Sequence, residues 1–547
     1  MRLPGFGVRA PLRLAFFATS GVAGGQMLDL EVNGALAAHQ DLGAGGRIEL
    51  DGWSDTLGTV VLRFTGPPPA RGGSVRLRRI EVTGAPAPVP RRRVLGYALL
   101  VALSLAGCAW AGAAARVSLL VLLAVSATTV LGLVLSRLAL LGRFESFLAA
   151  AFAALLLAQV ARGLGLHPAL AAVVAATFAI RLLFVLEPAF PGMDVTFHAH
   201  RIRAVQEGQL VKSAVAGPRL GSAVEIPYPP AFHTLLAPFV PRRDTPSGER
   251  AVRLAMAFFE GTAPLLLFLI ARRAGASELA ASFAAAMGAA MPEALLVLAE
   301  GIAANIAGNW FTLCAVLALV GEASPVVVAA TLALGFLMHP GAAAGLGALV
   351  VAWLLWRART EPVARLWRLI LALAAAVLLA FLAYYREVLP LTLQSLDTIR
   401  RGSAEQGRSL LHVEWVHLGK IVQNLLLKFG GAPLWLAALG LRAAPPRLRG
   451  LLVPWLGIAV FLAALAVFTP VALRFEYLAA PAVALAAGCG AAALWSEGKH
   501  RLVLALLGAT LLLQLTLGLL LLEGGFDLRN VIIPSDRWPI VRLFRTT

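Results

Sequence analysis

Long apolar segments, separated by short polar connections, occupy most of the chain from about residue 94 onward. Each holds roughly 17 to 25 residues, the length that an apolar helix needs to cross a bilayer. The pattern predicts about fourteen spans, at 94–114, 117–137, 144–163, 168–186, 254–271, 278–297, 301–320, 325–339, 341–357, 366–385, 417–441, 450–470, 474–494 and 501–522. The first four spans and the 325–357 pair have very short connections, so we predict a mainly α polytopic membrane protein with about 11 to 14 helices.

The first 86 residues follow a different pattern. Apolar and polar residues alternate at 28–32, 60–64 and 75–82, and turns such as Asn33-Gly34 separate these runs. Period-two runs bounded by turns predict antiparallel strands, and about six strands predict a small β-sandwich over 1–86. A proline-rich linker follows at 87–93. Residues 12–17 are too short for the apolar core of a signal peptide, so the domain either stays cytoplasmic or follows a missing upstream span.

Composition agrees with a membrane protein. Hydrophobic residues make up 59% of the 547 residues, charged residues only 14%, and the mean hydropathy is +0.80. The net charge of +18 would suggest nucleic acid in a soluble protein. Here the basic residues lie mainly in short connections, which favours loops that face anionic lipid. The cysteines, Cys108, Cys314 and Cys489, lie in apolar segments without ligand spacing, so we expect neither a disulfide framework nor zinc.

The distribution of basic residues predicts the topology. They occupy every second connection, at Arg272-Arg273, at Arg357, Arg359, Arg365 and Arg368, at Arg442, Arg447 and Arg449, and at Lys499 and Arg501. If these connections face the cytoplasm, those between them face outward. The loop at 187–253, the loop at 386–416, the corner at 470–474 and the tail at 524–547 are then external. Counting back through four spans also favours an external β-domain, against which Arg91-Arg92-Arg93 argues.

The loop at 187–253 gathers acids, histidines and arginines in a chain that is otherwise poor in them. Asp194, His198 and Arg201 have the spacing i, i+4, i+7, which places them on one face of a helix. Together they can take a proton from a hydroxyl and hold a phosphate. An interfacial helix with a solvated face explains the triplet equally well. His198 and His200 point apart on a helix, and the HExxH pattern is absent, so we predict no metal pair.

Further candidates lie along the chain. Tyr228 lies in Ile226-Pro-Tyr-Pro-Pro230, which is extended, and it can stack on a sugar or anchor the interface; His233 follows. Acidic and amide residues within the spans are functional candidates, or they join helices by hydrogen bonds. They are Glu260, Glu293, Glu300, Asn305 and Asn309. The external positions hold His339, Arg386, Arg401, Arg474 and Glu476. The three arginines among them can hold a lipid phosphate or anchor the interface.

Two short motifs resemble those of the GT-C glycosyltransferases, polytopic membrane enzymes that use polyprenyl-phosphate-linked sugars. The run from Asp194 to Arg201, with Tyr228-Pro-Pro-Ala-Phe232, resembles their first long external loop, and 474–481 resembles the Arg-to-Pro run of a late span. The resemblance covers 168–523. It implies that Asp194 is the catalytic base, or a ligand of a metal that organises the site, and that Arg474 lies near the donor phosphate. Many members have two adjacent acids where this chain has Met193 before Asp194.

The expected organisation is therefore a β-domain, accessory spans at 94–167, a GT-C-like module at 168–523 and a tail. The resemblance implies transfer of a sugar from a polyprenyl-phosphate donor to an envelope glycan, lipid or protein acceptor. The expected location is the external face of a bacterial inner membrane. Asp194 is the predicted catalytic residue, and the predicted substrate- and donor-binding residues are His198, Arg201, Tyr228, His233, Glu300, His339, Arg401, Arg474 and Glu476.

Three points stay open at this stage. No feature indicates a cofactor, although Mg²⁺ or Mn²⁺ is compatible with the family. A non-catalytic envelope assembly protein that binds polymer through the β-domain is one alternative function. A transporter or flippase is another, but it needs midplane ionisable groups and an internal repeat, and the ionisable residues cluster at the external span ends instead.

Overall fold

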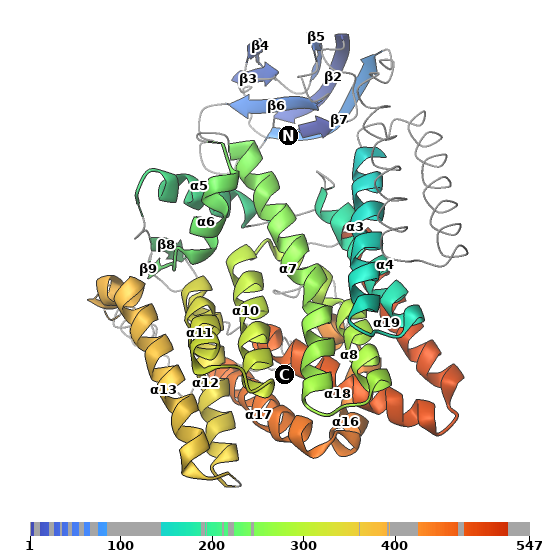
Figure 1. Cartoon of the computed structure of the whole chain (residues 1–547). Coiled ribbons are helices and arrows are strands. Elements are labelled where there is room, and N and C mark those ends of the chain that lie inside the picture. The colour runs from blue at the N-terminus through green and yellow to red at the C-terminus, as the bar shows by residue number, and fades with distance from the viewer. Residues whose placement is uncertain are drawn as a thin grey trace, which may run out of the picture. The chain divides into compact units, whose positions relative to one another are not determined.

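The computed structural model describes residues 2–4, 11–20, 27–32, 35–41, 46–53, 59–65, 75–84, 144–186, 192, 194–209, 213–216, 224–241, 245–359, 361–390, 393, 425–468 and 475–522. The chain divides into two compact units, Met1–Leu156 and Leu157–Thr547, and each is described by itself. The helices and strands are drawn in Figure 1. The predicted linker and the first two predicted spans lie outside the described residues.

The described residues of the first unit form seven strands in two antiparallel sheets. One sheet has the order β1-β6-β3-β4, with β1 (Arg2–Pro4), β6 (Thr59–Thr65), β3 (Met27–Val32) and β4 (Ala35–Asp41). The other has the order β5-β2-β7, with β5 (Gly46–Trp53), β2 (Pro11–Ser20) and β7 (Val75–Gly84). The alternating runs at 28–32, 60–64 and 75–82 therefore lie in strands. The packing of the two sheets as a sandwich stays a prediction.

The second unit is helical. Nearly every predicted span from 144–163 onward corresponds to a helix: α3 (Phe144–Gly163), α4 (Pro168–Leu186), α7 (Thr245–Arg273), α8 (Glu278–Ala290) with α9 (Glu293–Glu300), α10 (Ala303–Val320), α11 (Pro325–Met338), α12 (Pro340–Arg357), α13 (Val363–Ala380), α17 (Pro446–Phe468), α18 (Phe475–Ser496) and α19 (His500–Leu522). Within the described part of the chain, nine helical segments are long and apolar enough to cross a membrane. The protein is thus a multi-pass membrane protein.

One predicted span is interrupted. The sequence predicts a helix over 417–441, but in its described part a π-helical turn η6 (Leu425–Phe429) ends at Gly430, and α16 (Gly431–Ala443) starts afresh. Gly430 has a φ of +82°, a conformation that residues with a side chain rarely adopt. The interruption turns Lys428 into the protein, where its side chain is buried.

A second break separates α8 from α9 at Met291-Pro292. Proline lacks the N–H that would continue the helix, so carbonyl groups at the end of α8 need other donors. Gln514 of α19 donates to the carbonyl oxygens of Ala289 (3.2 Å) and Met291 (3.0 Å). Arg181 of α4 also donates to the Ala289 oxygen. Two distant helices therefore satisfy the backbone at the break.

The centre of the second unit is α18, which packs against α8 and α16. Small residues allow these helices to approach closely. A Cβ atom added at Gly440 of α16 would lie 1.7 Å from the carbonyl oxygen of Ala486, and one added at Gly488 of α18 would lie 2.4 Å from the nitrogen of Ala284. Both neighbours are backbone atoms, which cannot rotate away, so the two glycines set the spacing of the three helices.

We expect Gly440→Ala to lower the thermal unfolding temperature of the detergent-solubilised protein. The added methyl group would collide with the α18 backbone, and overpacking of this kind costs about 1–3 kcal/mol. The control is Gly457→Ala in α17, where no heavy atom lies within 4 Å of the added Cβ. Alanine has the higher helix propensity, so the control should be neutral or slightly more stable. Equal unfolding temperatures for the two variants would contradict the close α16–α18 contact.

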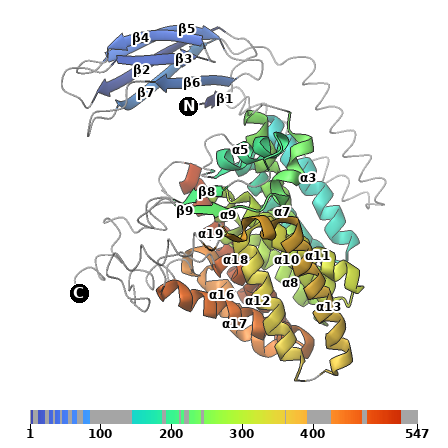
Figure 2. The ribbon, with the colours of Figure 1, turned by 90° about the vertical axis from the view of Figure 1, so that its left-hand side faces the viewer.

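Short elements lie together beside one end of α10 and α11, as Figure 1 and the rotated view in Figure 2 both show. They are α5 (Val195–Gln206), the antiparallel hairpin of β8 (Ser213–Ala216) and β9 (Val224–Pro227), and α6 (Ala231–Leu236). The α5 helix packs on α7, and α6 packs on α10 and α11. The predicted helix through 194–201 and the predicted extended segment before Tyr228 are both present.

Candidate functional site

Asp194 lies at the N-terminus of α5, as the residue before its first turn. Its backbone N–H donates a hydrogen bond to the carbonyl oxygen of Glu300, at 3.3 Å. The Asp194 side chain does not cap the helix, and it is only partly buried. The bond joins the start of the loop helix to the end of α9, so Asp194 is positioned by the transmembrane helices and not by the loop alone.

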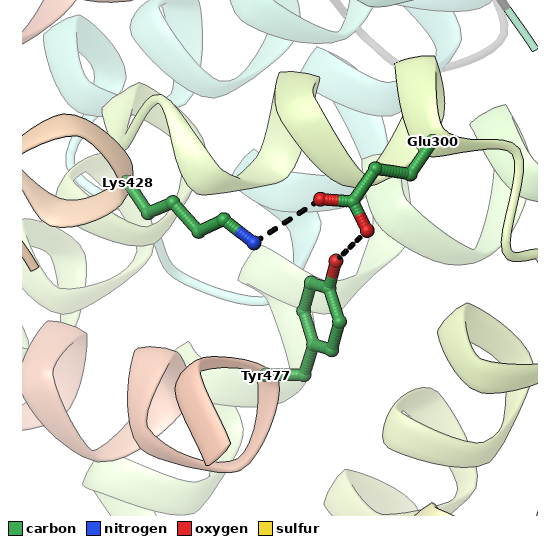
Figure 3. A network of polar contacts seen from close by, with 3 residues as sticks. All are labelled: Glu300, Lys428 and Tyr477. Atoms are coloured by element: carbon green, nitrogen blue, oxygen red, sulfur yellow. Dashed lines mark hydrogen bonds and ion pairs between the residues drawn. The ribbon is translucent and has the colours of Figure 1, made fainter. Parts of the chain in front are cut away.

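Glu300 forms a buried polar network with two residues that are distant in sequence (Figure 3). Lys428 donates to one carboxylate oxygen at 3.1 Å, and the Tyr477 hydroxyl donates to the other at 2.5 Å. The Lys428 nitrogen also lies 4.9 Å from the centre of the Tyr477 ring. The side chains of Glu300 and Lys428 are 5% and 3% exposed. The network thus neutralises both charges and ties α9, η6 and α18 together at the point where Asp194 is bound.

The sequence identified Glu300 but missed its partners. Lys428 is a single lysine in the apolar run Leu425-Leu-Leu-Lys-Phe429, and an ionisable residue in such a run is a functional candidate by default. The sequence could therefore have identified Lys428 as a candidate. Tyr477 lies three residues after Arg474 in the run at 474–481, but nothing in its sequence context pairs it with Glu300.

A second group of candidates surrounds Tyr228. The Nδ1 atom of His198 and the Nε2 atom of His233 lie 3.0 Å apart, so one nitrogen donates to the other. Both histidines are 0% exposed. The Tyr228 ring centre lies 6.0 Å from each of their rings and 5.3 Å from the ring of His339, the residue that caps α12. Four of the predicted binding residues therefore form one aromatic cluster, contributed by α5, α6 and the α11–α12 corner.

The environment of His233 holds its ring in the neutral state. Burial lowers the pKa of His233 well below its ordinary value, and His198 and Arg201 lower it further, while the nearby backbone of Pro229 opposes them. A proton on this ring would add a second buried positive charge beside Arg201. The surroundings therefore favour the neutral form of His233 beside the charged Arg201.

The thermal stability of the protein is expected to fall as the pH drops below about 6.5. In the unfolded chain His233 binds a proton near its ordinary pKa, whereas in the folded protein its pKa is lower, so acid favours the unfolded state. Unfolding temperatures measured between about pH 5 and pH 8 should decline less steeply for His233→Asn than for wild type. His200→Asn, which changes an exposed histidine of the same helix, is the control. Equal slopes for all three proteins would contradict the prediction.

Arg201 is buried, not solvated. Its side chain is 2% exposed, and its Nη2 atom donates to the carbonyl oxygen of Tyr228 at 3.0 Å. The alternative of an interfacial helix with a solvated face is therefore wrong for His198 and Arg201. The neighbouring His200 is exposed, in agreement with the expectation that His198 and His200 point apart.

The remaining candidates either lie elsewhere in the second unit or fall outside the described residues. Arg401 and Arg474 lie outside the described residues, and the side chain of Glu476 does too, although its backbone begins α18. Glu260, Glu293 and Asn309 line a cavity between the helices, and Arg386 is exposed. Within the described ranges, no three His, Cys, Asp or Glu side chains gather closely enough to hold a metal ion.

Comparison with known proteins gives structural neighbours only. No protein-family model and no curated protein sequence matches the chain. A crystal structure of the Archaeoglobus fulgidus oligosaccharyltransferase with a tethered acceptor peptide matches with a TM-score of 0.42 at 12% identity, and covers 65% of this chain and 55% of its own. The arabinofuranosyltransferase AftD from Mycobacteria matches with a TM-score of 0.40 at 19% identity, over 63% of this chain and 28% of its own.

The chain covers 55% of the length of the first neighbour and 28% of the length of the second. The activities, substrates and partners of these neighbours are therefore stated of those proteins alone.

Proposed function

We propose that the protein transfers a sugar from a polyprenyl-phosphate donor to a hydroxyl group of a glycan, lipid or protein acceptor. The observation that carries the proposal is the position of Asp194. A carboxylate begins the loop helix, and its backbone is bonded to the end of a membrane-spanning segment beside a buried network. A lipid-borne donor presents its reacting carbon at the membrane surface, where such a residue can meet it.

In this mechanism the acceptor oxygen attacks the anomeric carbon of the sugar. Asp194 takes the proton of the acceptor hydroxyl, the bond between the anomeric carbon and the phosphate oxygen breaks, and its electron pair leaves with the polyprenyl phosphate. The configuration at the anomeric carbon inverts, because the acceptor enters opposite the leaving group. General-base assistance of this kind contributes about 10²–10⁴-fold to a rate.

Glu300, Lys428 and Tyr477 serve as the support for Asp194. The carboxylate of Glu300 already accepts hydrogen bonds from both partners, so it is poorly suited to accept a further proton. Its backbone carbonyl is what binds Asp194. We therefore assign the network a positioning role, with Asp194 as the base.

The external face of a bacterial inner membrane is the proposed location of the site. Arg272 and Arg273 end α7, and Arg357 ends α12, so these basic residues lie at the far ends of helices whose other ends meet the loop at 187–253. Basic connections favour the cytoplasmic side. The opposite ends, where Asp194 and His339 lie, then face outward. By the same count the N-terminal strands, as a β-sandwich, lie outside and can contact the acceptor.

The direct test is chemical analysis of cells that lack the protein. If the proposal is right, lipid-linked sugar accumulates in the membrane, and mass spectrometry of the extracted lipid identifies both the sugar and the polyprenyl chain. Re-expression of the full chain should remove the accumulated lipid. Unchanged lipid pools, together with binding of envelope polysaccharide by the purified protein, would favour a non-catalytic assembly protein instead.

A transporter is the second candidate, because Arg181, Glu260 and Glu293 lie among the helices, and the last two line a cavity. However, Arg181 donates to the backbone oxygens of Glu260 and Ala289, the latter at the break after α8. Arg181 therefore has a structural role, since it satisfies backbone carbonyl groups. Uptake of labelled polyprenyl-phosphate sugar across the bilayer of proteoliposomes, without transfer to an acceptor, would favour transport over catalysis.

A further inference from the structure

Arg201 carries an unusual charge for its surroundings. Its side chain is 2% exposed, and only Nη2 has a hydrogen-bond acceptor, the Tyr228 carbonyl. The Nε and Nη1 atoms are buried without a hydrogen-bond partner. A guanidinium has five N–H donors, and leaving buried donors of a charged group unused is costly. The arrangement in the described residues is therefore incomplete as a purely structural one.

No carboxylate compensates the charge among the described residues. The ionisable side chains that lie close to Arg201 are the phenols of Tyr384 and Tyr228, and no ion pair joins Arg201 to an acid in this part of the chain. Asp194 is seven residues earlier on the same helix, which separates the two by about 10 Å along the axis. An ion pair needs a nitrogen–oxygen distance of about 4 Å or less. Among the described residues, Arg201 is thus a buried cation without a carboxylate partner.

A second buried donor lies next to Arg201. Tyr384, in the π-helical turn η5 (Phe381–Tyr385) that follows α13, is 2% exposed, and its hydroxyl has no hydrogen-bond partner in the structure. It lies close enough to Arg201 for the two side chains to interact. The adjacent Tyr385 differs, since its hydroxyl donates to the carbonyl oxygen of Phe336 at 2.8 Å. A π-helical turn often marks a functional position, because it shifts one side chain out of the helical register.

We propose that Arg201 and Tyr384 bind a phosphate group. The guanidinium offers two parallel N–H donors and the phenol one O–H donor, which suits the oxygens of a phosphate ester. The charge of the phosphate supplies the anion that Arg201 lacks. The His198–His233 pair lies beside this site, and His233, whose pKa is lowered by burial, adds no second cation next to Arg201.

This site deepens the proposed function, since the phosphate can be that of the lipid donor or of the polyprenyl phosphate product. Asp194 and Arg201 lie on one face of α5, about two helical turns apart. The base and the phosphate site thus lie on either side of His198 along α5. A free phosphate ion has the same recognition chemistry, and the experiment separates the two sources.

Binding can be measured without turnover, with the purified full chain in lipid nanodiscs. The ligands are polyprenyl phosphate, the uncharged polyprenol with the same tail, and inorganic phosphate. Polyprenyl phosphate should bind at least about 10-fold more tightly than polyprenol, because a charge-assisted hydrogen bond distinguishes the two. Binding of inorganic phosphate with the same dependence on Arg201 would indicate a free phosphate as the ligand. Equal binding of polyprenol and polyprenyl phosphate would overturn the proposal.

The variants are Arg201→Gln and Tyr384→Phe. We expect about 10- to 100-fold weaker binding of polyprenyl phosphate for the first, and a few-fold weaker binding for the second. The matched controls are Arg203→Gln, which removes an exposed arginine of the same helix, and Tyr385→Phe, which removes the neighbouring hydroxyl. Both controls should bind as wild type does. If the controls weaken binding as much as the variants, the site is not at Arg201 and Tyr384.

Two further readouts separate this inference from its alternatives. Because Arg201 lacks an anion, the ligand-free Arg201→Gln protein should unfold at the wild-type temperature or above it. A large loss of stability in both variants would instead show a structural role. Asp194→Asn should bind polyprenyl phosphate as wild type does. If phosphate binding depends on Arg201 but no sugar is transferred by the wild type, the phosphate site stands and the proposed reaction fails.

Discussion

Asp194→Asn is expected to lower the rate of sugar transfer by about 10²–10⁴-fold while the protein keeps its fold. Asparagine has nearly the same shape but cannot take a proton from the acceptor hydroxyl. The backbone N–H that bonds to the Glu300 carbonyl is unchanged by the substitution, so α5 should keep its position. The measurement is transfer from the lipid-linked sugar identified in the deletion strain, by protein reconstituted in liposomes.

The matched control for this prediction is Glu207→Gln. It removes a carboxylate from the other end of α5, where Glu207 pairs with Arg203 at 2.9 Å on the surface. Exposed pairs of this kind contribute about 1 kcal/mol or less, so the variant should transfer sugar at the wild-type rate. Transfer by Asp194→Asn at more than about a tenth of the wild-type rate would rule out Asp194 as the base.

Lys428→Met is expected to lower the free energy of unfolding by about 3–5 kcal/mol, the largest effect on stability that we predict. The substitution removes one partner of a buried ion pair and leaves the carboxylate of Glu300 without its cation, 5% exposed, in a region that water does not reach. Methionine fills nearly the same volume, so the loss reports the charge and not a cavity. Reversible unfolding in mixed detergent micelles measures the difference.

A double variant separates the pair from the packing. Lys428→Met combined with Glu300→Gln removes both charges, and the amide can still accept the hydrogen bond of the Tyr477 hydroxyl. Replacing both members of a buried ion pair is often close to neutral, so the double variant should recover most of the lost stability. A double variant as unstable as Lys428→Met alone would show that the network does not act as an ion pair.

The positions of the helices were predictable because hydropathy records contact with lipid, residue by residue, without knowledge of the fold. Asp194 and α5 were predictable for a similar reason, since helical spacing is a local property. The burial of Arg201 was not, because it depends on Tyr228, which approaches from 27 residues away. The partners of Glu300 come from 128 and 177 residues away, and no local pattern records such a pairing.

The helix interruption at Gly430 shows a second reason why part of the fold could not be predicted from the sequence. An apolar run over 417–441 has the composition of a single span, and the paired glycines Gly430-Gly431 were the visible sign of a break. Glycine is tolerated within helices, however, so the sign alone does not decide. What decides is the gain from bringing Lys428 to Glu300, which is a tertiary interaction. The position of Lys428 therefore required the structure, although its identity as an unusual residue did not.

The break between α8 and α9 has a consequence for how the protein is made. Ribosomes deliver the chain from its N-terminus, so α4 with Arg181 enters the membrane before the carbonyl of Ala289 exists, and the amide of Gln514 arrives last, 225 residues after that carbonyl. Until then the Arg181 side chain and the carbonyl groups at the helix break must interact with lipid head groups, water or the insertion machinery instead. Assembly of the core around α18 is thus a late event, completed when α19 is synthesised.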